Sequence, residues 1–166
     1  KNGNLLREVN CMPQMNKGGK FIFGMSFIRD NLEVHFPPQA INEYNICLED
    51  KVYLFTGAKA TGGFCVTRKG LLMPSKIGNI LKDTPDLRDY KLPEGKFADY
   101  KGRKYCWISI SKDGIIELTD EMLQVLDISV GMELLSIRSS DIAFTMGAKG
   151  PLLEKAKKYK GIIEVY

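Results

Sequence analysis

The stretch DGIIELTDEMLQVLDISVGMELLSI, residues 113–137, has the pattern of a complete small structural unit. A turn is followed by a short strand, a helix, a glycine turn and the strand MELLSI. Thr119 is the predicted N-cap, and Asp120 and Glu121 place negative charge at the positive end of the helix dipole. The apolar face of this predicted helix consists of Met122, Leu123 and Leu126.

The same order of elements occurs earlier in the chain, at a shift that sets Phe36 on Leu118 (118 − 36 = 82). Apolar positions then coincide in the pairs Val34/Ile116, Ile41/Leu123, Tyr44/Leu126, Ile46/Ile128, Val52/Leu134 and Phe55/Ile137. After a gap of two residues, Lys69-Gly70 falls on Lys149-Gly150. This self-similarity predicts an internal duplication. A single unit would leave sheet edges open and one face wet, whereas two units can pair their faces and close a small barrel.

Alternation, turn residues and prolines predict the other elements and the division of the chain. The expected elements are strands 20–28 and 32–36, helix 38–44, strands 51–56 and 63–68, a helix capped by Ser75, a hairpin from residue 104, a helix from Pro151 and a strand 162–166. The expected regions are an N-terminal arm 1–19, a first repeat 20–82, a linker or long loop 83–103, and a second repeat 104–166 that includes the C-terminal helix and strand.

Four segments carry a resemblance to a known family: VHFPP (34–38), NICLEDKVYL (45–54), SKDGIIEL (111–118) and LDISVGMELLSI (126–137). With them, most of residues 20–82 and 104–150 resembles the AbrB/SpoVT-like swapped-hairpin, or cradle-loop barrel, proteins. The resemblance implies a β-rich α+β fold, in which two ββαββ-like swapped-hairpin repeats with short helices form a small closed β-barrel. The tandem chain would correspond to the family's dimer fused into one polypeptide.

The resemblance also implies a function, that of a prokaryotic DNA-binding transcriptional regulator. The family places an arginine before the strand that leads into the helix, where this sequence has Glu33 and Ile115. The net charge of +4, from 24 basic and 20 acidic residues, permits a polyanionic partner such as double-stranded DNA. The candidate DNA-binding residues near the hairpin loops are Arg29, Lys101, Arg103, Lys104 and Lys112.

A second hypothesis is a ligand-sensing or protein-interaction module that keeps the barrel but does not bind DNA, since one fold hosts many functions. A Lys-Gly pair precedes a predicted helix twice, as Lys69-Gly70 and Lys149-Gly150. Free N–H groups at a helix start, beside a lysine, can hold a small anionic ligand. A plain turn and helix cap is the alternative interpretation of the same residues.

Other classes of protein are not expected from the sequence. The four cysteines form no C-x-x-C pair and His35 is the only histidine, which argues against a zinc site. No metal site, cofactor or catalytic constellation is predicted, so the chain is not expected to be an enzyme. No stretch has the length of a membrane span, and the cysteine pattern is typical of a reduced, cytoplasmic protein. The resemblance further allows a homodimer formed by hairpin exchange.

Overall fold

The computed structural model describes residues 21–159, 161 and 163–166 and confirms the expected β-rich α+β class. The strands are β1 (Ile22–Phe27), β2 (Glu33–His35), β3 (Lys51–Thr56), β4 (Phe64–Thr67), β5 (Ala98–Tyr100), β6 (Arg103–Ser109), β7 (Ile115–Glu117), β8 (Glu133–Arg138) and β9 (Phe144–Gly147). The helices are α2 (Pro38–Tyr44), α3 (Lys69–Leu72), α4 (Asn79–Asp83), α5 (Pro85–Arg88), α6 (Asp120–Leu126) and α7 (Pro151–Lys157). The predicted N-terminal arm lies outside the described residues.

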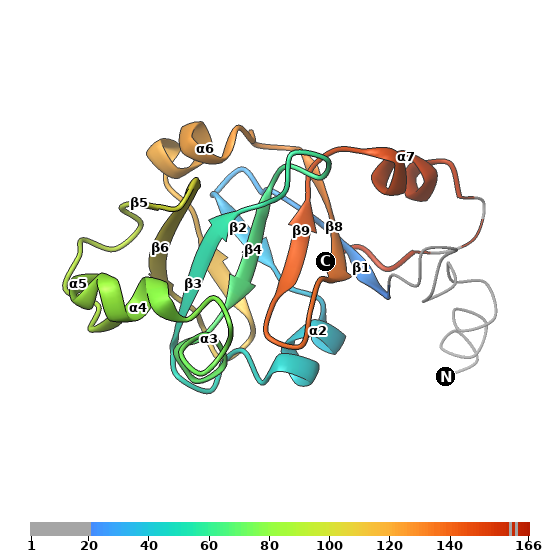
Figure 1. Cartoon of the computed structure of the whole chain (residues 1–166). Coiled ribbons are helices and arrows are strands. Elements are labelled where there is room, and N and C mark those ends of the chain that lie inside the picture. Colours follow the sequence, from blue (N-terminus) through green and yellow to red (C-terminus); the bar gives the residue numbers. More distant parts are fainter. Residues whose placement is uncertain (1–20, 160, 162) are drawn as a thin grey trace.

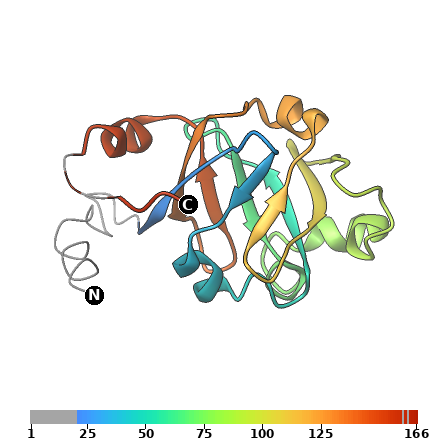
Figure 2. The same cartoon turned by 180° about the vertical axis from the view of Figure 1, so that it is seen from behind.

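The strands form two layers. Seven of them make one sheet in the order β1-β8-β9-β4-β3-β6-β5, and β2 and β7 make a second, two-stranded sheet. The small sheet lies across one face of the large one, in front of it in Figure 2 and behind it in Figure 1. Every pairing between named strands is antiparallel, and one isolated parallel bridge joins Met25 to Val165.

Strands of the first half of the chain pair with strands of the second half. β1 pairs with β8, β3 with β6, β2 with β7 and β4 with β9. Adding 82 to the bounds of β2, α2 and β3 gives the bounds of β7, α6 and β8. Backbone bonds repeat in the same way: Leu118 N–H donates to the Leu32 carbonyl at 2.9 Å, and Phe36 N–H donates to the Gly114 carbonyl at 3.0 Å. Six neighbouring strands of the large sheet lie in the order β1-β8-β9-β4-β3-β6. When each strand is replaced by its counterpart in the other half, the same order results, read from the opposite end.

The large sheet does not close on itself. Its edge strands are β1 and β5, and no pairing joins them among the described residues. The second face of the core is supplied by the separate β2–β7 ribbon. Backbone hydrogen bonds between the described strands therefore do not close the sheet, and the closed barrel stays a prediction.

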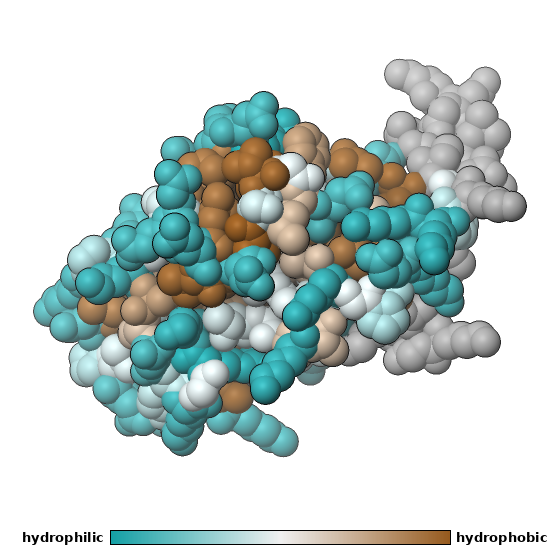
Figure 3. Space-filling model, turned by 90° about the horizontal axis from the view of Figure 1, so that it is seen from above, coloured by the Kyte–Doolittle hydropathy of each residue, from teal (hydrophilic) through white to brown (hydrophobic). Residues whose placement is uncertain are grey.

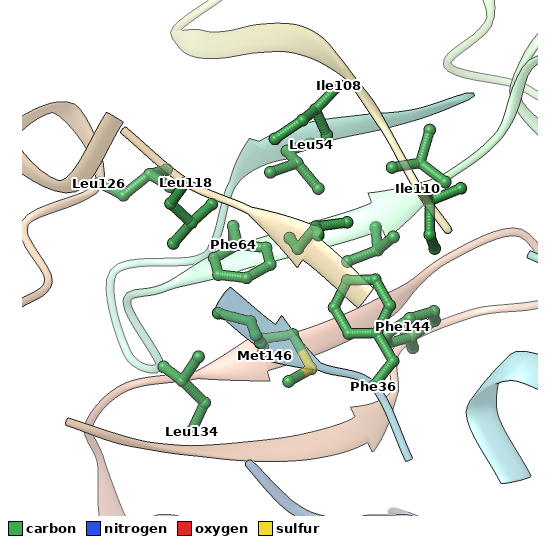
Figure 4. Close-up of a cluster of buried hydrophobic side chains, with 14 of the residues drawn as sticks. Phe36, Leu54, Phe64, Ile108, Ile110, Leu118, Leu126, Leu134, Phe144 and Met146 are labelled. Carbon is green, nitrogen blue, oxygen red and sulfur yellow. The ribbon is translucent and has the colours of Figure 1, made fainter. Parts of the chain in front are cut away.

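The main core fills the space between the two sheets and α2 and α6. Phe144 is fully buried there, and its ring lies 5.2 Å from that of Phe36 and 5.3 Å from that of Tyr44, between centroids. Figure 4 shows side chains from both halves of the chain meeting in this cluster. They include Leu54 and Phe64 from the first half, and Leu118, Leu134 and Met146 from the second.

The start of α6 follows the prediction. Thr119 has extended backbone angles, and its Oγ1 accepts the Met122 N–H at 3.2 Å. Its counterpart at the start of α2 is Pro37, which makes no side-chain cap bond. Both helices end on a left-handed residue, Asn45 and Asp127. The two helices thus end alike but begin differently, and of the two only α6 has a hydroxyl cap.

Replacing this cap is expected to have a modest, measurable effect. Thr119→Ala leaves the N–H of Met122 without its acceptor, and such a change costs about 1 kcal/mol of unfolding free energy. Urea unfolding followed by circular dichroism measures the loss. Thr119→Ser keeps the hydroxyl and serves as the control. Equal losses in the two variants would show that the hydroxyl does not act as a cap.

Residues 83–103, expected as a linker or long loop, contain α5 and β5 and take part in packing. Leu87 is fully buried, and Tyr90 stacks on Tyr53 with 5.8 Å between ring centroids. The indole N–H of Trp107 donates to the Leu92 carbonyl at 2.7 Å. The segment, together with α4, therefore covers part of the large sheet on the side away from the main core, and α7 covers another part.

Candidate functional site: a groove on the outer face of the sheet

One row of side chains crosses the outer face of the large sheet, the face away from the main core. The strand registers pair Tyr105 with Phe55, Phe55 with Cys65, Cys65 with Thr145, and Thr145 with Ile137. These five residues come from five different strands. They lie on the same face because side chains alternate between the two faces of the sheet along each strand. Near the middle of the row, Cys65 Sγ and Thr145 Oγ1 lie 3.4 Å apart.

The central part of this row is the floor of a hollow of about 510 Å³. Its floor is apolar at Phe55 and Ile137 and carries the Cys65 thiol and the Thr145 hydroxyl between them. Its walls come from the β3–β4 loop, the segment before α4, the β8–β9 loop and the start of α7. The lining wall residues are Ala58, Thr61, Ile77, Ser139, Ser140, Ile142, Ala143, Pro151 and Leu152.

A second hollow of about 310 Å³ adjoins the first, and the two share Ile77 and Arg103 in their linings. It is further lined by Lys76, Asn79, Tyr100, Lys101 and Tyr105. We call the two hollows together the outer groove. Its lining contains three cationic side chains, those of Lys76, Lys101 and Arg103, and no carboxylate. The Asp83 carboxylate accepts a hydrogen bond from the Tyr100 hydroxyl, but Asp83 is not part of the lining.

Two cations of the outer groove, Arg103 and Lys101, lie over aromatic rings. The Arg103 guanidinium lies 5.3 Å from the centroid of the Phe55 ring, and Lys101 Nζ lies 5.4 Å from that of Tyr100. Neither residue, nor Lys76, forms an ion pair with any residue that the structure describes. Arg103 is close enough to Cys65 and Tyr105 for its charge to lower the pKa of both, although burial raises both overall. The lining thus combines an apolar floor with uncompensated positive charge.

The structure separates the candidate DNA-binding residues. Lys101 and Arg103 belong to the outer groove, but the neighbouring Lys104 pairs with Asp99 at 2.6 Å and does not line it. The Arg29 Nε is buried without a hydrogen-bond partner, and its guanidinium lies 5.0 Å from the Phe27 ring centroid. The five cations therefore do not form one continuous surface.

Their positions along the molecule differ as well. The β1–β2 turn, which holds Arg29, and the β5–β6 turn lie at the end that carries α6. The β6–β7 turn, which holds Lys112, lies at the opposite end, where Gly114 meets Ile41 of α2. The view onto the α6 end shows hydrophobic patches among the hydrophilic residues (Figure 3). Lys112 and the β5–β6 turn lie at opposite ends of the molecule, so a DNA duplex bound at one end could not contact both.

The β2–β7 ribbon carries acidic residues. Glu33 and Glu117 are direct partners across the two strands. Together with Glu94 they line a hollow of about 440 Å³ on this side of the molecule. His35 Nε2 lies 3.1 Å from the Glu33 carboxylate. These negative charges oppose the approach of a nucleic-acid backbone to this ribbon. Glu33 is one of the two positions at which the resembling family would have arginine, and the other, Ile115, is uncharged.

The two Lys-Gly pairs lie in different places and have different local roles. The Gly70 N–H already donates to the Glu49 carboxylate at 3.0 Å, and that carboxylate also pairs with Arg68 at 2.7 Å. Gly150 has φ +102°, and a Cβ there would lie 2.4 Å from the Ala60 carbonyl oxygen. The first pair thus holds an anion of the protein itself, and the second needs glycine for its backbone. Binding of an external anion at either pair stays a prediction.

Burial keeps the core thiols protonated. Cys65 and Cys106 are buried and Cys47 is half-buried, in line with the expected packing role. Burial raises the pKa of the Cys106 thiol to about 12. Burial also raises the pKa of Cys65, and the Thr145 hydroxyl partly offsets this rise. A thiol of this kind is a weak nucleophile at neutral pH.

The Cys106 thiol predicts a loss of stability at alkaline pH. In the unfolded chain it ionises near its ordinary pKa of 9.0, and in the folded chain at about 12. Between these values the unfolded state has lost the proton that the folded state keeps, so stability falls as pH rises, by up to about 1.4 kcal/mol per pH unit. Urea unfolding of the wild type and Cys106→Ala at pH 8 to 11 measures the two slopes. Parallel slopes would contradict the assignment, because other titrating groups are common to both proteins.

The described residues contain neither a metal-binding cluster nor a membrane-spanning helix. No group of three or more His, Cys, Asp or Glu side chains is arranged to hold a metal ion within the described ranges. None of the helices in the described part of the chain has the length and apolar character required to cross a membrane. No family model, curated protein or solved structure matches the chain.

Only part of the outer groove is predictable from the sequence. Lys101 and Arg103 are predicted as binding residues, but for DNA, and Phe55 and Ile137 are predicted as equivalent repeat positions. Ile77 and Thr145 are not predicted, because the groove joins a loop and strands that lie far apart in the chain. The signal in the sequence is that β3, β4 and β8 carry apolar residues at the alternate positions as well as at the core positions. Apolar residues on both faces indicate that the outer face of the sheet is covered too.

Proposed function

We propose that the chain is a non-enzymatic binding module, built from two fused swapped-hairpin units, and that its ligand site is the outer groove. The observation that carries the proposal is the meeting of two hollows at Arg103, with a lining that holds three cations and no carboxylate, and none of these cations forms an ion pair with a residue that the structure describes. Binding sites of small molecules are typically apolar hollows of about 300–1,000 Å³ with a few convergent polar groups.

The pairing of the strands supports the fused-unit part of the proposal. The first hairpin strand of each half pairs with the third strand of the other half, as β1 with β8 and β6 with β3. The shift of 82 residues that β2, α2 and β3 share, followed by a shift of 80 between β4 and β9, is what a duplication with a short gap would leave. All these pairings are made within one chain, so hairpin exchange with a second copy is not required for them. Light scattering after size exclusion measures whether a homodimer nevertheless forms.

The groove position is tested by blocking it. Ala58 is exposed and lines the outer groove, whereas Ala60 is exposed in the same loop and does not line it. We expect Ala58→Trp to abolish the stabilisation that organic anions of small-molecule size give in a thermal-shift panel, and Ala60→Trp to leave it unchanged. A panel in which both variants respond like the wild type would place the binding site elsewhere and overturn the proposal.

Duplex DNA is a second candidate partner, in the role of a transcriptional regulator. The observation that favours it is the cluster of Lys101, Arg103 and Lys104 at one turn. If it binds DNA, affinity falls with rising salt, with a slope close to the number of phosphates contacted. We compare the wild type with a Lys101/Arg103/Lys104→Ala variant at several salt concentrations. No affinity for duplex DNA in the wild type at low salt would exclude this function.

A further inference from the structure

The two halves of the outer groove differ in chemical character. The larger hollow has an apolar lining at Phe55, Ile77, Ile137, Ile142 and Leu152, with hydroxyl groups at its edge. The smaller hollow is lined by Lys76, Lys101 and Arg103 together with Asn79 and two tyrosines. An occupant that spans both hollows therefore meets an apolar surface at one end and positive charge at the other.

Arg103 lies where the two hollows meet. Its guanidinium is held against the Phe55 ring, and no carboxylate of the described residues pairs with it. By comparison, Arg138 makes a paired contact with both oxygens of Glu43, and Arg68 pairs with Glu49 at 2.7 Å. An arginine that keeps its fork of donors free at the mouth of an apolar hollow fits a planar anionic group.

The asymmetry of the covers explains why both lysines of the groove lie in one half of it. The outer row runs through Cys65 and Thr145, which occupy matching positions of the two halves. One side of it is walled by the 83–103 segment and the residues before α4, and the other side by α7. The cationic hollow lies on the first side only. An elongated ligand is thereby given a direction, with its charged end toward β5.

We propose that the outer groove binds an amphiphilic anion of small-molecule size, with one anionic head group at Arg103, Lys101 and Lys76 and an apolar body over Phe55, Cys65 and Ile137. This inference rests on the proposed function, because it names the chemistry of the ligand for the same site. A carboxylate on an alkyl chain and a sulfonate on an aromatic body share this chemistry.

The test uses three probes that differ in one feature each. Decanoate, below its micelle concentration, has the head group and the apolar body. Decyltrimethylammonium has the same body with a cationic head, and inorganic phosphate is an anion without a body. Each is titrated against the complete chain with anilinonaphthalene sulfonate bound, and loss of the dye's fluorescence reports displacement. We expect displacement by decanoate, at least tenfold weaker displacement by the cationic analogue, and none by phosphate.

Variants assign the head-group contact. Arg103→Gln removes the charge and keeps a polar side chain, and it is expected to weaken decanoate binding by about tenfold or more, the usual size of one charged hydrogen bond. Arg88→Gln is the matched control, because Arg88 is partly exposed, pairs with Asp89 and does not line the groove. It is expected to bind decanoate as the wild type does.

The outcomes separate this inference from the proposed function. If Ala58→Trp blocks binding but decyltrimethylammonium or phosphate binds as well as decanoate, the groove is a binding site and the amphiphilic-anion inference is wrong. An Arg103→Gln variant with wild-type affinity for decanoate also overturns the inference. If Ala58→Trp retains full decanoate binding, both the inference and the groove as the binding site fail.

Discussion

Phe144→Ala is expected to lower the free energy of unfolding by about 3–5 kcal/mol, the usual cost of removing a buried phenyl ring. Phe144 is fully buried and contacts the rings of Phe23, Phe36 and Tyr44, which belong to the first half of the chain. Its loss leaves a cavity between the two sheets that none of these rings can fill without leaving its own packing site. Since domains are stable by about 5–15 kcal/mol, this one change removes a large part of the total.

Urea unfolding followed by far-ultraviolet circular dichroism measures the effect of Phe144→Ala. Leu48→Ala is the control, because Leu48 is 61% exposed and its removal creates no cavity. The control is expected to stay within about 0.5 kcal/mol of the wild type. Equal losses in the two variants would show that the Phe144 ring does not hold the sheets together.

Gly63→Ala is expected to cost about 2–5 kcal/mol, from two separate causes. Gly63 has φ +63°, a conformation that costs a residue with a Cβ about 1–2 kcal/mol. An added Cβ would also lie 1.9 Å from the Met146 carbonyl oxygen, so β9 must move away from β4, which costs about 1–3 kcal/mol more. Both strands contribute to the floor of the outer groove, at Cys65 and Thr145. We therefore expect the substitution to weaken ligand binding as well.

A matched glycine separates the two causes. Gly131 has φ +88°, and an added Cβ there meets no atom within 4 Å. Gly131→Ala is expected to show the backbone cost alone, and the difference between the two variants measures the clash with Met146. Thermal unfolding of both variants in parallel gives this difference. A loss in Gly131→Ala as large as that in Gly63→Ala would show that β4 and β9 tolerate the extra methyl group.

The proposed fusion of two units in one chain would have a structural consequence at the outer groove. A symmetric pair of identical units would place identical covers on both sides of the Cys65–Thr145 row. Here the 83–103 segment occurs once, between the two halves, and α7 with the C-terminal segment covers the other side. The two sides can therefore carry different chemistry, and only one of them holds Lys101 and Arg103. This is the physical reason to expect an asymmetric ligand.

The local elements could be predicted from the sequence because their causes are local. Helix 38–44 and strand 51–56 have the predicted bounds, and the predicted cap of Thr119 is confirmed. Prolines, alternation and a capping hydroxyl act within a few residues of the element that they define. The packing of residues 83–103 could not be predicted, because their apolar residues are too scattered to show a period and pack against elements distant in the chain, such as β3 and β6.

The sequence by itself determined the α+β class, the bounds of helix 38–44 and strand 51–56, and the shift of 82 residues between β2, α2 and β3 and β7, α6 and β8, since hydrophobic period and turn chemistry are written in neighbouring residues. The helix expected to be capped by Ser75 begins instead at Asn79, with Gly78 as its N-cap. Only the tertiary structure decided that Phe55, Cys65 and Thr145 form one row, that Arg103 separates from Lys104, and that the β2–β7 ribbon is acidic. These features depend on strand register and on loops distant in the chain, and a register is fixed only when the whole core packs.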